Sequence, residues 1–533
     1  RAVSVVDDVC KSIGIDVSDV DVDSDLIYDN LQNLRTPHGL FQIEAETNYR
    51  VCQKVKPKNL EQLSGVLALA RPGALAFANQ YAEYVNDGKY EAIHPFFDDI
   101  LSSTGGVALY QEQLMKMAHK IGFTLDESEI LRRIVGKKKV SEVRKWKKKI
   151  KDKVKQNNLD EEIGDILWGV LEDSANYSFN KSHSISYAML AAITIYLKFK
   201  YPKQFFLSLL KMTRHEPDPI QEISKIQREM HNFGVKLLPP HIIKSQMDFS
   251  VEGDDIRFGL LSIKGISEKS IEKLNNFKDN YSTKFEVFEG AKESGLTIGI
   301  LSALIQAGTF QGFQMSRSKI VYEGQLWNIL LKKEKATALK LGEKFDYDLV
   351  KIVKHMCGMK NDNGKPIIKE SRLQTIKKRT DAYKEIYHKN NSSESFANWF
   401  YENTLLGYTY GKRLIDIFRE KTNGLMSVAS CEEAEVDETV AFVGTIEDKP
   451  YFGKSRNDNE YMKVFVKDET AAIKVMIFNN KLAKMITENG SKHPEQGNIV
   501  IVRGVKKDEV VFADQIAIQT NKIYTKLSDL KSA

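Results

Sequence analysis

The sequence predicts a multidomain α+β protein in which a long, mostly helical part is followed by a small C-terminal β-barrel. The length of 533 residues is enough for about three or four domains. Apolar residues recur at spacings of three and four in the first part, as at Leu114, Met117 and Ile121, which is typical of helices. After residue 437, short β-branched runs alternate with polar turns, which indicates strands.

Composition excludes several protein classes. Hydrophobic residues make up 42% and charged residues 28%, as in ordinary soluble proteins. The longest apolar run, 185–197, is too short to cross a bilayer and predicts a buried helix. The four cysteines form no Cys-x-x-Cys pair, so we expect neither a zinc site nor a disulfide framework. We therefore expect a cytoplasmic protein.

Positive charge is concentrated in one stretch. Residues 131–155 hold 13 Lys or Arg against two acidic residues, whereas the whole chain has a net charge of only +6. A field of this density favours a polyanion as partner. Paired arginines offer planar forks to phosphate oxygens, and lysines offer point charges. The alternative is a solvated helical face.

Five segments follow one another in the first part of the chain. They are Gly-Leu-Phe-Gln-Ile-Glu at 39–44, the Arg-Pro-Gly element within 68–75, and the segments 106–118, 131–139 and 177–187. Together they resemble the fingers domain of C-family DNA polymerases, the bacterial DNA polymerase III alpha subunits. The resemblance implies a replicative DNA-directed DNA polymerase that binds the incoming nucleotide and primer–template DNA. Gln111 and Glu112 are interpreted as structural residues that tie helices together.

Charge and position divide the candidate binding residues into two sets. The nucleotide-binding set is Arg132, Arg133, Lys137, Lys138, Asn180, Lys181, Ser182 and His183. The DNA-binding set is Arg71, Lys139, Lys145, Lys147, Lys148, Lys149, Lys264, Gly265, Ile266, Ser267, Lys454 and Arg456. The arginine pair is the first choice for the triphosphate. For Arg71, contact with DNA and a structural role within the fingers remain equal alternatives.

No catalytic or metal-binding residue is predicted in this chain. Two-metal nucleotidyl transfer needs carboxylates that hold both metals, and the family carries three aspartates in its palm domain. The first eight residues resemble the helix that follows the last of these aspartates. Asp21, Asp23 and Asp25 alternate, but they lie in a polar loop without flanking strands. We therefore expect an N-terminal partner to carry the palm and its Mg²⁺, and the chain alone to be inactive.

A helix-hairpin-helix is predicted at 256–274. Its turn, Gly265-Ile266-Ser267, would aim backbone N–H groups at a DNA phosphate. A serine replaces the usual second glycine and can cap the next helix. An ordinary turn between helices is the alternative. The following Lys-rich helical region has no counterpart in the family and is interpreted as an insertion of open role, with 390–393 as a linker.

Five strand candidates with a helix at 481–489 between the third and the fourth predict an OB-fold barrel. Such barrels bind single strands by basic grooves and aromatic stacking. The candidates around the first hairpin are Tyr451, Phe452, Lys454, Arg456 and Tyr461. The alternative is that these aromatic residues are core or loop anchors.

The predicted domains are a residual palm edge and connector at 1–35, fingers at 36–213, a clamp-binding region with the helix-hairpin-helix at 214–315, the insertion and linker at 316–436 and the OB-fold at 437–533. The family binds a sliding clamp through a short peptide, for which 395–400 is the nearest candidate in position, although it lacks the glutamine of the motif. The family's C-terminal adapter domain is not recognised, which favours a phage or divergent replicase. The alternative function is a non-catalytic DNA-binding accessory or repair protein.

Overall fold

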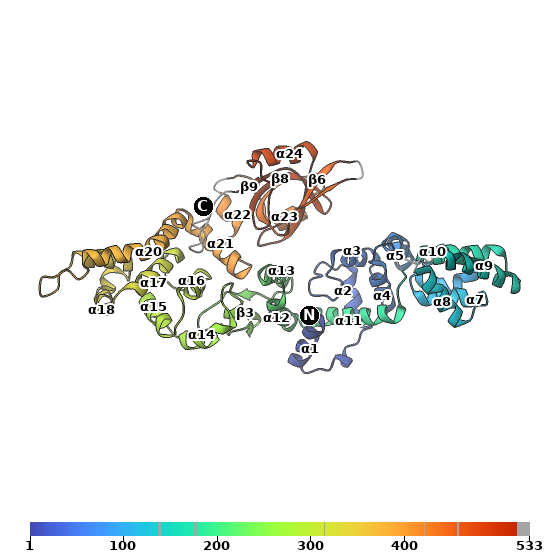
Figure 1. Cartoon of the computed structure of the whole chain (residues 1–533), viewed down its shortest axis with the longest axis horizontal. Helices are drawn as coiled ribbons and strands as arrows, with labels where there is room; N and C mark the ends of the chain where they lie inside the picture. Colours follow the sequence, from blue (N-terminus) through green and yellow to red (C-terminus); the bar gives the residue numbers. More distant parts are fainter. Residues whose placement is uncertain (137–139, 175–177, 314, 420–421, 456–457, 520–533) are drawn as a thin grey trace. The chain divides into compact units, whose positions relative to one another are not determined.

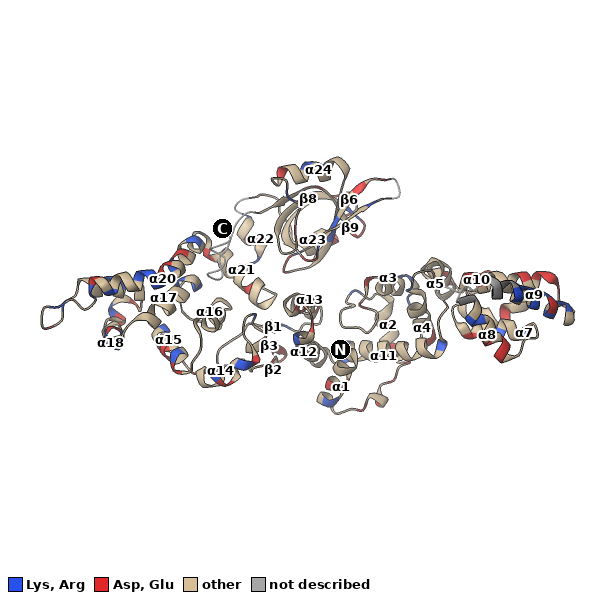
Figure 2. Cartoon of the chain, viewed as in Figure 1, with Lys and Arg blue, Asp and Glu red and all other residues tan. Residues whose placement is uncertain are grey.

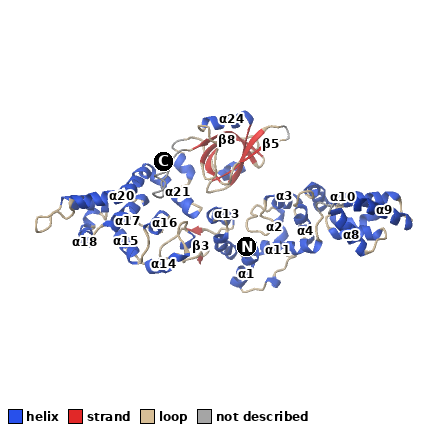
Figure 3. Cartoon of the chain, in the orientation of Figure 1, coloured by secondary structure: helices blue, strands red, loops and turns tan. Residues whose placement is uncertain are grey.

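The computed structural model describes residues 1–136, 140–174, 178–313, 315–419, 422–455 and 458–519. The chain divides into two compact units, Arg1–Met212 and Thr213–Ala533. The first unit consists of helices and their connections, and the second adds a β-barrel to a helical part (Figures 1 and 3). The predicted fold class, a mostly helical chain followed by a C-terminal barrel, is confirmed.

A 20-residue helix, α11, lies at the centre of the first unit. The helices of this unit are α1 Ala2–Ile13, α2 Asp25–Gln32, α3 Glu46–Val55, α4 Leu60–Leu69, α5 Ala78–Asp87, α6 Asp98–Leu101, α7 Gln111–Lys120, α8 Leu125–Gly136, α9 Val140–Gln156, α10 Glu161–Ser174, α11 Lys181–Lys200 and α12 Pro202–Met212. Helix α11 contacts α1, α2, α4 and α12. Small side chains such as Ala188, Ala191 and Ala192 are fully buried, so the apolar run is a core helix as predicted.

The first unit has two hydrophobic cores. One joins helices α2 to α5 with α11. The other joins helices α6 to α10, where α9 contributes Trp146, Ile150 and Val154. These three residues are four positions apart, so one stripe of α9 is buried and the lysines between them are left at the surface.

The second unit begins with helices around a small sheet. The helices are α13 Pro219–Asn232, α14 Ile271–Phe277, α15 Lys284–Glu293, α16 Ile298–Gln306, α17 Arg317–Ile329, α18 Lys332–Leu341, α19 Leu349–Gly358, α20 Glu370–Asn390, α21 Glu394–Leu406, α22 Leu414–Phe418 and α23 Val428–Glu433. The sheet has the order β1 Leu237–Leu238, β3 Asp255–Arg257 and β2 Ser250–Glu252. The predicted linker at 390–393 is wrong: a 3₁₀ turn joins α20 to α21, and the buried Asn390 amide donates to the Tyr401 hydroxyl at 2.6 Å.

The barrel closes on itself. Its elements are β4 Thr439–Ile446, β5 Tyr451–Lys454, β6 Glu460–Lys467, β7 Ala472–Phe478, α24 Asn479–Glu488, β8 Ile499–Lys507 and β9 Val510–Ile518. The strand order is β4-β8-β9-β7-β6-β5, and β4 also pairs with β6 to complete the ring. The parallel pairing of β7 with β9, with α24 between β7 and β8, is consistent with the predicted OB-fold. Strand β5 is a short addition to the five predicted strands.

Polar contacts fix the barrel to the helices of its own unit. Arg228 of α13 pairs with Glu447 at 2.5 Å, and Trp399 of α21 donates to Glu469 at 2.5 Å. Phe396 and Trp399 are buried in a cluster that includes barrel residues. The segment 395–400, the nearest candidate for a clamp-binding peptide, lies within α21, and its Phe396 and Trp399 side chains are buried.

Candidate nucleotide and nucleic-acid interface

The first turn of α11 is anchored by a carboxylate from α7. The side chain of Asn180 caps α11 by accepting the His183 N–H at 2.9 Å. Glu112 accepts the Lys181 backbone N–H at 2.9 Å and the Asn180 side-chain amide at 3.0 Å. The structural role assigned to Glu112 is confirmed, because it ties α7 to α11. Three candidate nucleotide-binding residues, Asn180, Lys181 and His183, are thereby brought together.

An aromatic ladder runs along the outer side of this turn. The Arg71 guanidinium carbon lies 3.4 Å from the centroid of the Phe179 ring. Ring centroids then follow at 5.2 Å from Phe179 to His183, 4.1 Å from His183 to Tyr187 and 5.3 Å from Tyr187 to Phe41. We call these five residues the aromatic ladder. The aromatic ladder joins three of the five sequence segments. Partial burial lowers the pKa of the Arg71 guanidinium.

Beneath the turn lies a buried polar network. The Tyr110 hydroxyl bonds to Ser64 at 3.0 Å, and Ser64 also bonds to Ser184 of α11 at 2.9 Å. Burial raises the pKa of Tyr110 to about 12, so the phenol stays protonated. The Lys181 ammonium lies 5.5 Å from the centroid of the Tyr110 ring and pairs with Glu61. The network therefore fixes the orientation of the turn that carries the candidate residues.

Both candidate triphosphate arginines are held by one carboxylate. Glu129 bonds to Arg132 through two contacts at 2.8 Å and to Arg133 at 2.6 Å. These hydrogen bonds, with Arg132 the strongest, lower the pKa of Glu129 to about 2. The Arg133 side chain is 65% exposed against 24% for Arg132. The hydrogen bond to Glu129 is the main cause that raises the pKa of Arg132. Helix α8, which carries both arginines, packs against α7. The candidates Lys137, Lys138 and Lys139 lie outside the described residues.

The lysines of α9 form an exposed basic face. Lys145, Lys147, Lys148 and Lys149 are all exposed, and Figure 2 shows basic residues along this helix. The ammonium of Lys147 lies 5.7 Å from the Trp168 ring centroid, and that of Lys149 lies 4.1 Å from the Trp146 ring centroid. Their stems cover buried tryptophans while their charges stay at the surface.

The predicted hairpin turn is present at 264–267. Gly265 has a φ of +94°, which favours glycine, and Lys264 and Ser267 are exposed around the buried Ile266. The Lys264 backbone N–H donates to Leu405 of α21 at 3.0 Å. Ser267 makes no side-chain cap, and a 3₁₀ turn precedes α14, so the predicted serine cap is wrong.

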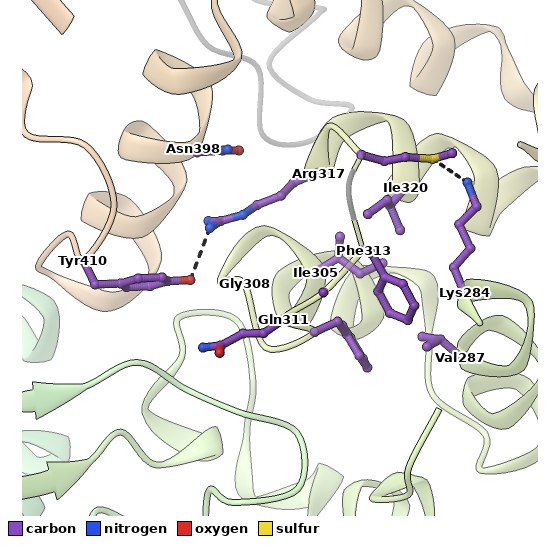
Figure 4. A pocket seen from close by; sticks show the side chains of 13 residues that line it. Lys284, Val287, Ile305, Gly308, Gln311, Phe313, Arg317, Ile320, Asn398 and Tyr410 are labelled. Atoms are coloured by element: carbon purple, nitrogen blue, oxygen red, sulfur yellow. Dashed lines mark hydrogen bonds between the residues drawn. The ribbon is translucent and has the colours of Figure 1, made fainter. Parts of the chain in front are cut away.

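A cavity of about 350 Å³ lies beside α15, α16 and α17 (Figure 4). Figure 4 shows Arg317 directed at Tyr410, and Lys284 directed at the sulfur of Met315. Both cations are already paired with carboxylates, Arg317 with Glu402 and Lys284 with Glu323. The cavity is thus lined by internally compensated charges, and we assign it no phosphate-binding role.

The outer face of the barrel brings the candidates Tyr451 and Tyr461 together with two aromatic rings that the sequence analysis did not single out. Tyr451 packs against Tyr461, Tyr461 against Phe478 and Phe478 against Phe512, with centroid distances of 6.1, 5.8 and 5.2 Å. Lys463 lies 5.4 Å from the Tyr451 ring centroid. These rings come from four neighbouring strands, β5, β6, β7 and β9. Sequence reasoning missed Phe478 and Phe512 because their partners are distant in sequence.

Two further barrel candidates are not on this face. Phe452 alternates with Tyr451 along β5, and its ring packs against His493 at 5.2 Å. Lys454 pairs with Asp458 at 3.3 Å, and Arg456 lies outside the described residues. We call Tyr451, Tyr461, Lys463, Phe478 and Phe512 the barrel platform.

Within the part of the chain that the structure describes, no three His, Cys, Asp or Glu side chains are grouped so as to hold a metal ion. The same residues include no helix with the length and apolarity that a membrane crossing requires.

Two family models match parts of this chain. Residues 2–158 match the model of the bacterial DNA polymerase III alpha subunit finger domain, and residues 234–320 match a helix-hairpin-helix motif. The DNA polymerase III subunit alpha of Aquifex aeolicus is 32% identical over 58% of this chain and 27% of its own length. The subunits of Treponema pallidum, at 31%, and Thermus aquaticus, at 29%, match to a similar extent.

The chain spans about a quarter of the length of these relatives. The resemblance predicted from the five segments is confirmed, because the finger-domain match covers four of them and the hairpin match covers the predicted turn. By these matches, and by its helical part followed by a barrel, the chain is related to the bacterial DNA polymerase III alpha subunits through their finger domain and a helix-hairpin-helix region.

Proposed function

We propose that this chain supplies the nucleotide-binding and DNA-binding surfaces of a replicative DNA-directed DNA polymerase. The observation that carries the proposal is the convergence of four of the five sequence segments around the first turn of α11. Phe41, Arg71 and Phe179 meet in the aromatic ladder, and Glu112 joins the α7 segment to Asn180. The remaining segment, with Arg132 and Arg133, lies on α8, which packs against α7.

The residues suit a nucleoside triphosphate. Arg133 is the more exposed arginine and can exchange its contact with Glu129 for a phosphate oxygen, while Arg132 stays on the carboxylate. His183 is exposed and lies between two rings of the ladder, where a base or sugar can stack. The α9 lysines extend the positive surface to a DNA backbone.

Among the described residues, no three His, Cys, Asp or Glu side chains are grouped so as to hold a metal ion. We therefore derive no catalytic step here. We propose that a palm carrying the aspartates and Mg²⁺ acts with this chain, and that the chain alone binds primed DNA without extending it. We further propose that the barrel platform holds single-stranded template by stacking. A sliding clamp remains a proposed partner, with no peptide assigned.

Primer extension tests the polymerase proposal. The purified chain alone should incorporate no nucleotide, and addition of a palm-bearing partner chain should restore Mg²⁺-dependent extension. Steady extension by the chain alone would refute the division of labour. Failure of every palm-bearing partner to restore extension, with DNA binding intact, would favour a non-catalytic accessory protein.

A salt series tests the DNA surface. Replacing Lys147, Lys148 and Lys149 with Gln should weaken binding to all sequences alike. The slope of log affinity against log salt should become shallower by up to about three, if each lysine contacts a duplex phosphate. Fluorescence anisotropy measures the slope, and an unchanged slope would leave these lysines as a solvated face.

A further inference from the structure

The insertion between the hairpin region and the barrel is a folded module with a strongly positive surface. We define the lysine-rich module as residues 331–390, which contain α18, α19 and α20. Neither family model extends beyond residue 320, so the resemblance assigns this module no role. Helices α19 and α20 both pack on α17, and α18 packs on α19. The charges of the module are thus displayed by a defined fold.

Ion pairs inside the module neutralise its buried charges. Glu334 is 4% exposed and bonds to Arg372 of α20 at 3.2 Å. Asp348 is 3% exposed and pairs with Lys319 of α17 at 2.5 Å. A buried charge must be paired, so these carboxylates are committed to the fold. Asp348 also lies 3.6 Å from the exposed Lys351, so it offsets one of the surface cations, whereas Glu334 is paired with the partly buried Arg372.

The surface of the module keeps a large positive excess. Fourteen of its Lys and Arg residues are exposed, against six exposed Asp and Glu residues. Lys377, Lys378, Arg379 and Lys384 of α20 are among them, and among the described residues none of these four is in an ion pair. Figure 2 shows basic residues along α20 and at α18. A surface of this sign attracts a polyanion.

The length of α20 suits contact along a DNA duplex. Helix α20 has 21 residues, so it extends for about 30 Å at 1.5 Å per residue. That is about the length of nine base pairs at 3.4 Å each. Single-strand sites stack bases on exposed rings, whereas Tyr383 and Tyr387 on α20 are only partly exposed, and the exposed Lys and Arg of this helix outnumber its exposed Asp and Glu. We propose that the lysine-rich module is a second, sequence-independent binding surface for duplex DNA.

This proposal adds a surface to the proposed polymerase function. The test compares two variants of the full chain on a fluorescent blunt DNA duplex. One variant carries Lys377→Gln, Lys378→Gln and Lys384→Gln on α20. The control carries Lys481→Gln, Lys484→Gln and Lys492→Gln, which remove the same charge from exposed positions on and after α24. Circular dichroism checks that both variants are folded.

The α20 variant should bind the duplex on the order of tenfold more weakly near 0.1 M salt, with a slope shallower by up to about three. The control should retain most of the wild-type affinity. A wild-type slope in the α20 variant, or an equal loss in the control, would overturn the proposal for the module. If replacing Lys147, Lys148 and Lys149 weakens duplex binding and the α20 substitutions do not, the proposal for the module is overturned and the proposed polymerase function stands. If the unsubstituted chain binds no duplex, both the module proposal and the proposed DNA-binding function are overturned.

Discussion

The carboxylate of Glu112 accepts the backbone N–H of Lys181 at 2.9 Å, across 69 residues of chain. The same carboxylate accepts the Asn180 side-chain amide. One residue of α7 therefore holds the first turn of α11 at the point where the candidate nucleotide-binding residues lie. The position of this turn depends on a contact between segments rather than on the turn's own sequence.

Glu112→Gln should weaken this anchor, because a glutamine side chain offers one oxygen where the carboxylate offers two. Loss of one such bond should cost about 1 kcal/mol in the free energy of unfolding. It should also raise the apparent nucleotide KM of the reconstituted polymerase. Urea unfolding and steady-state kinetics measure the two effects. Glu61→Gln is the control, since it breaks the Lys181 side-chain pair and leaves the backbone contact; an equal rise in KM in both variants would argue against the anchor.

Arg133→Ala should lower kcat/KM for nucleotide about ten- to a hundredfold, because one charge-assisted phosphate contact is worth about 1.5–3 kcal/mol. Primed-DNA affinity should change little. Arg132→Ala should additionally destabilise the fold, since Arg132 is the more buried partner of Glu129. Normal nucleotide kinetics combined with a collapse of DNA binding would reverse the assignment.

Tyr451 and Phe452 are adjacent, similarly exposed and on opposite faces of β5. Tyr451→Ala should weaken binding of single-stranded DNA by about 1–3 kcal/mol, the usual cost of losing one stacked base. Phe452→Ala should leave the affinity near that of wild type. Anisotropy with a labelled oligonucleotide measures both. Equal losses would mean that the hairpin, and not the barrel platform, binds the strand.

Lys467 makes the stability of the second unit depend on pH. Burial lowers the pKa of its ammonium from 10.5 to about 8, although Glu447 at 3.8 Å opposes the shift. The unfolded chain therefore holds a proton that the folded chain has released, and stability should rise as the pH increases from about 8 to 10.5.

Lys467→Met should flatten this rise in urea unfolding measured between pH 7.5 and 10.5. Lys463→Met, four residues earlier on the same face of β6, is the matched control and should keep the rise. An identical pH profile in the Lys467 variant and in wild type would contradict the buried-lysine explanation.

Local sequence patterns were sufficient to predict most helices and strands and to recognise the family resemblance. The 3.6-residue period predicted the helices, and the apolar run predicted α11 as a buried helix. The alternating β-branched runs predicted β4 and β6 to β9. Gly265 adopts the left-handed conformation that a hairpin turn needs. These features depend on neighbours within a few residues, so a single sequence contains the information.

The sites were decided by the tertiary structure. The sequence gives no sign that Glu129 holds both arginines, that Arg71 lies on Phe179 or that Phe512 meets Phe478. Phe396 and Trp399, within the candidate clamp-binding peptide, are buried in a core cluster that includes barrel residues. Such outcomes depend on which surfaces meet after the elements form. Burial and pairing between residues tens to hundreds of positions apart are set by packing, which local spacing does not encode.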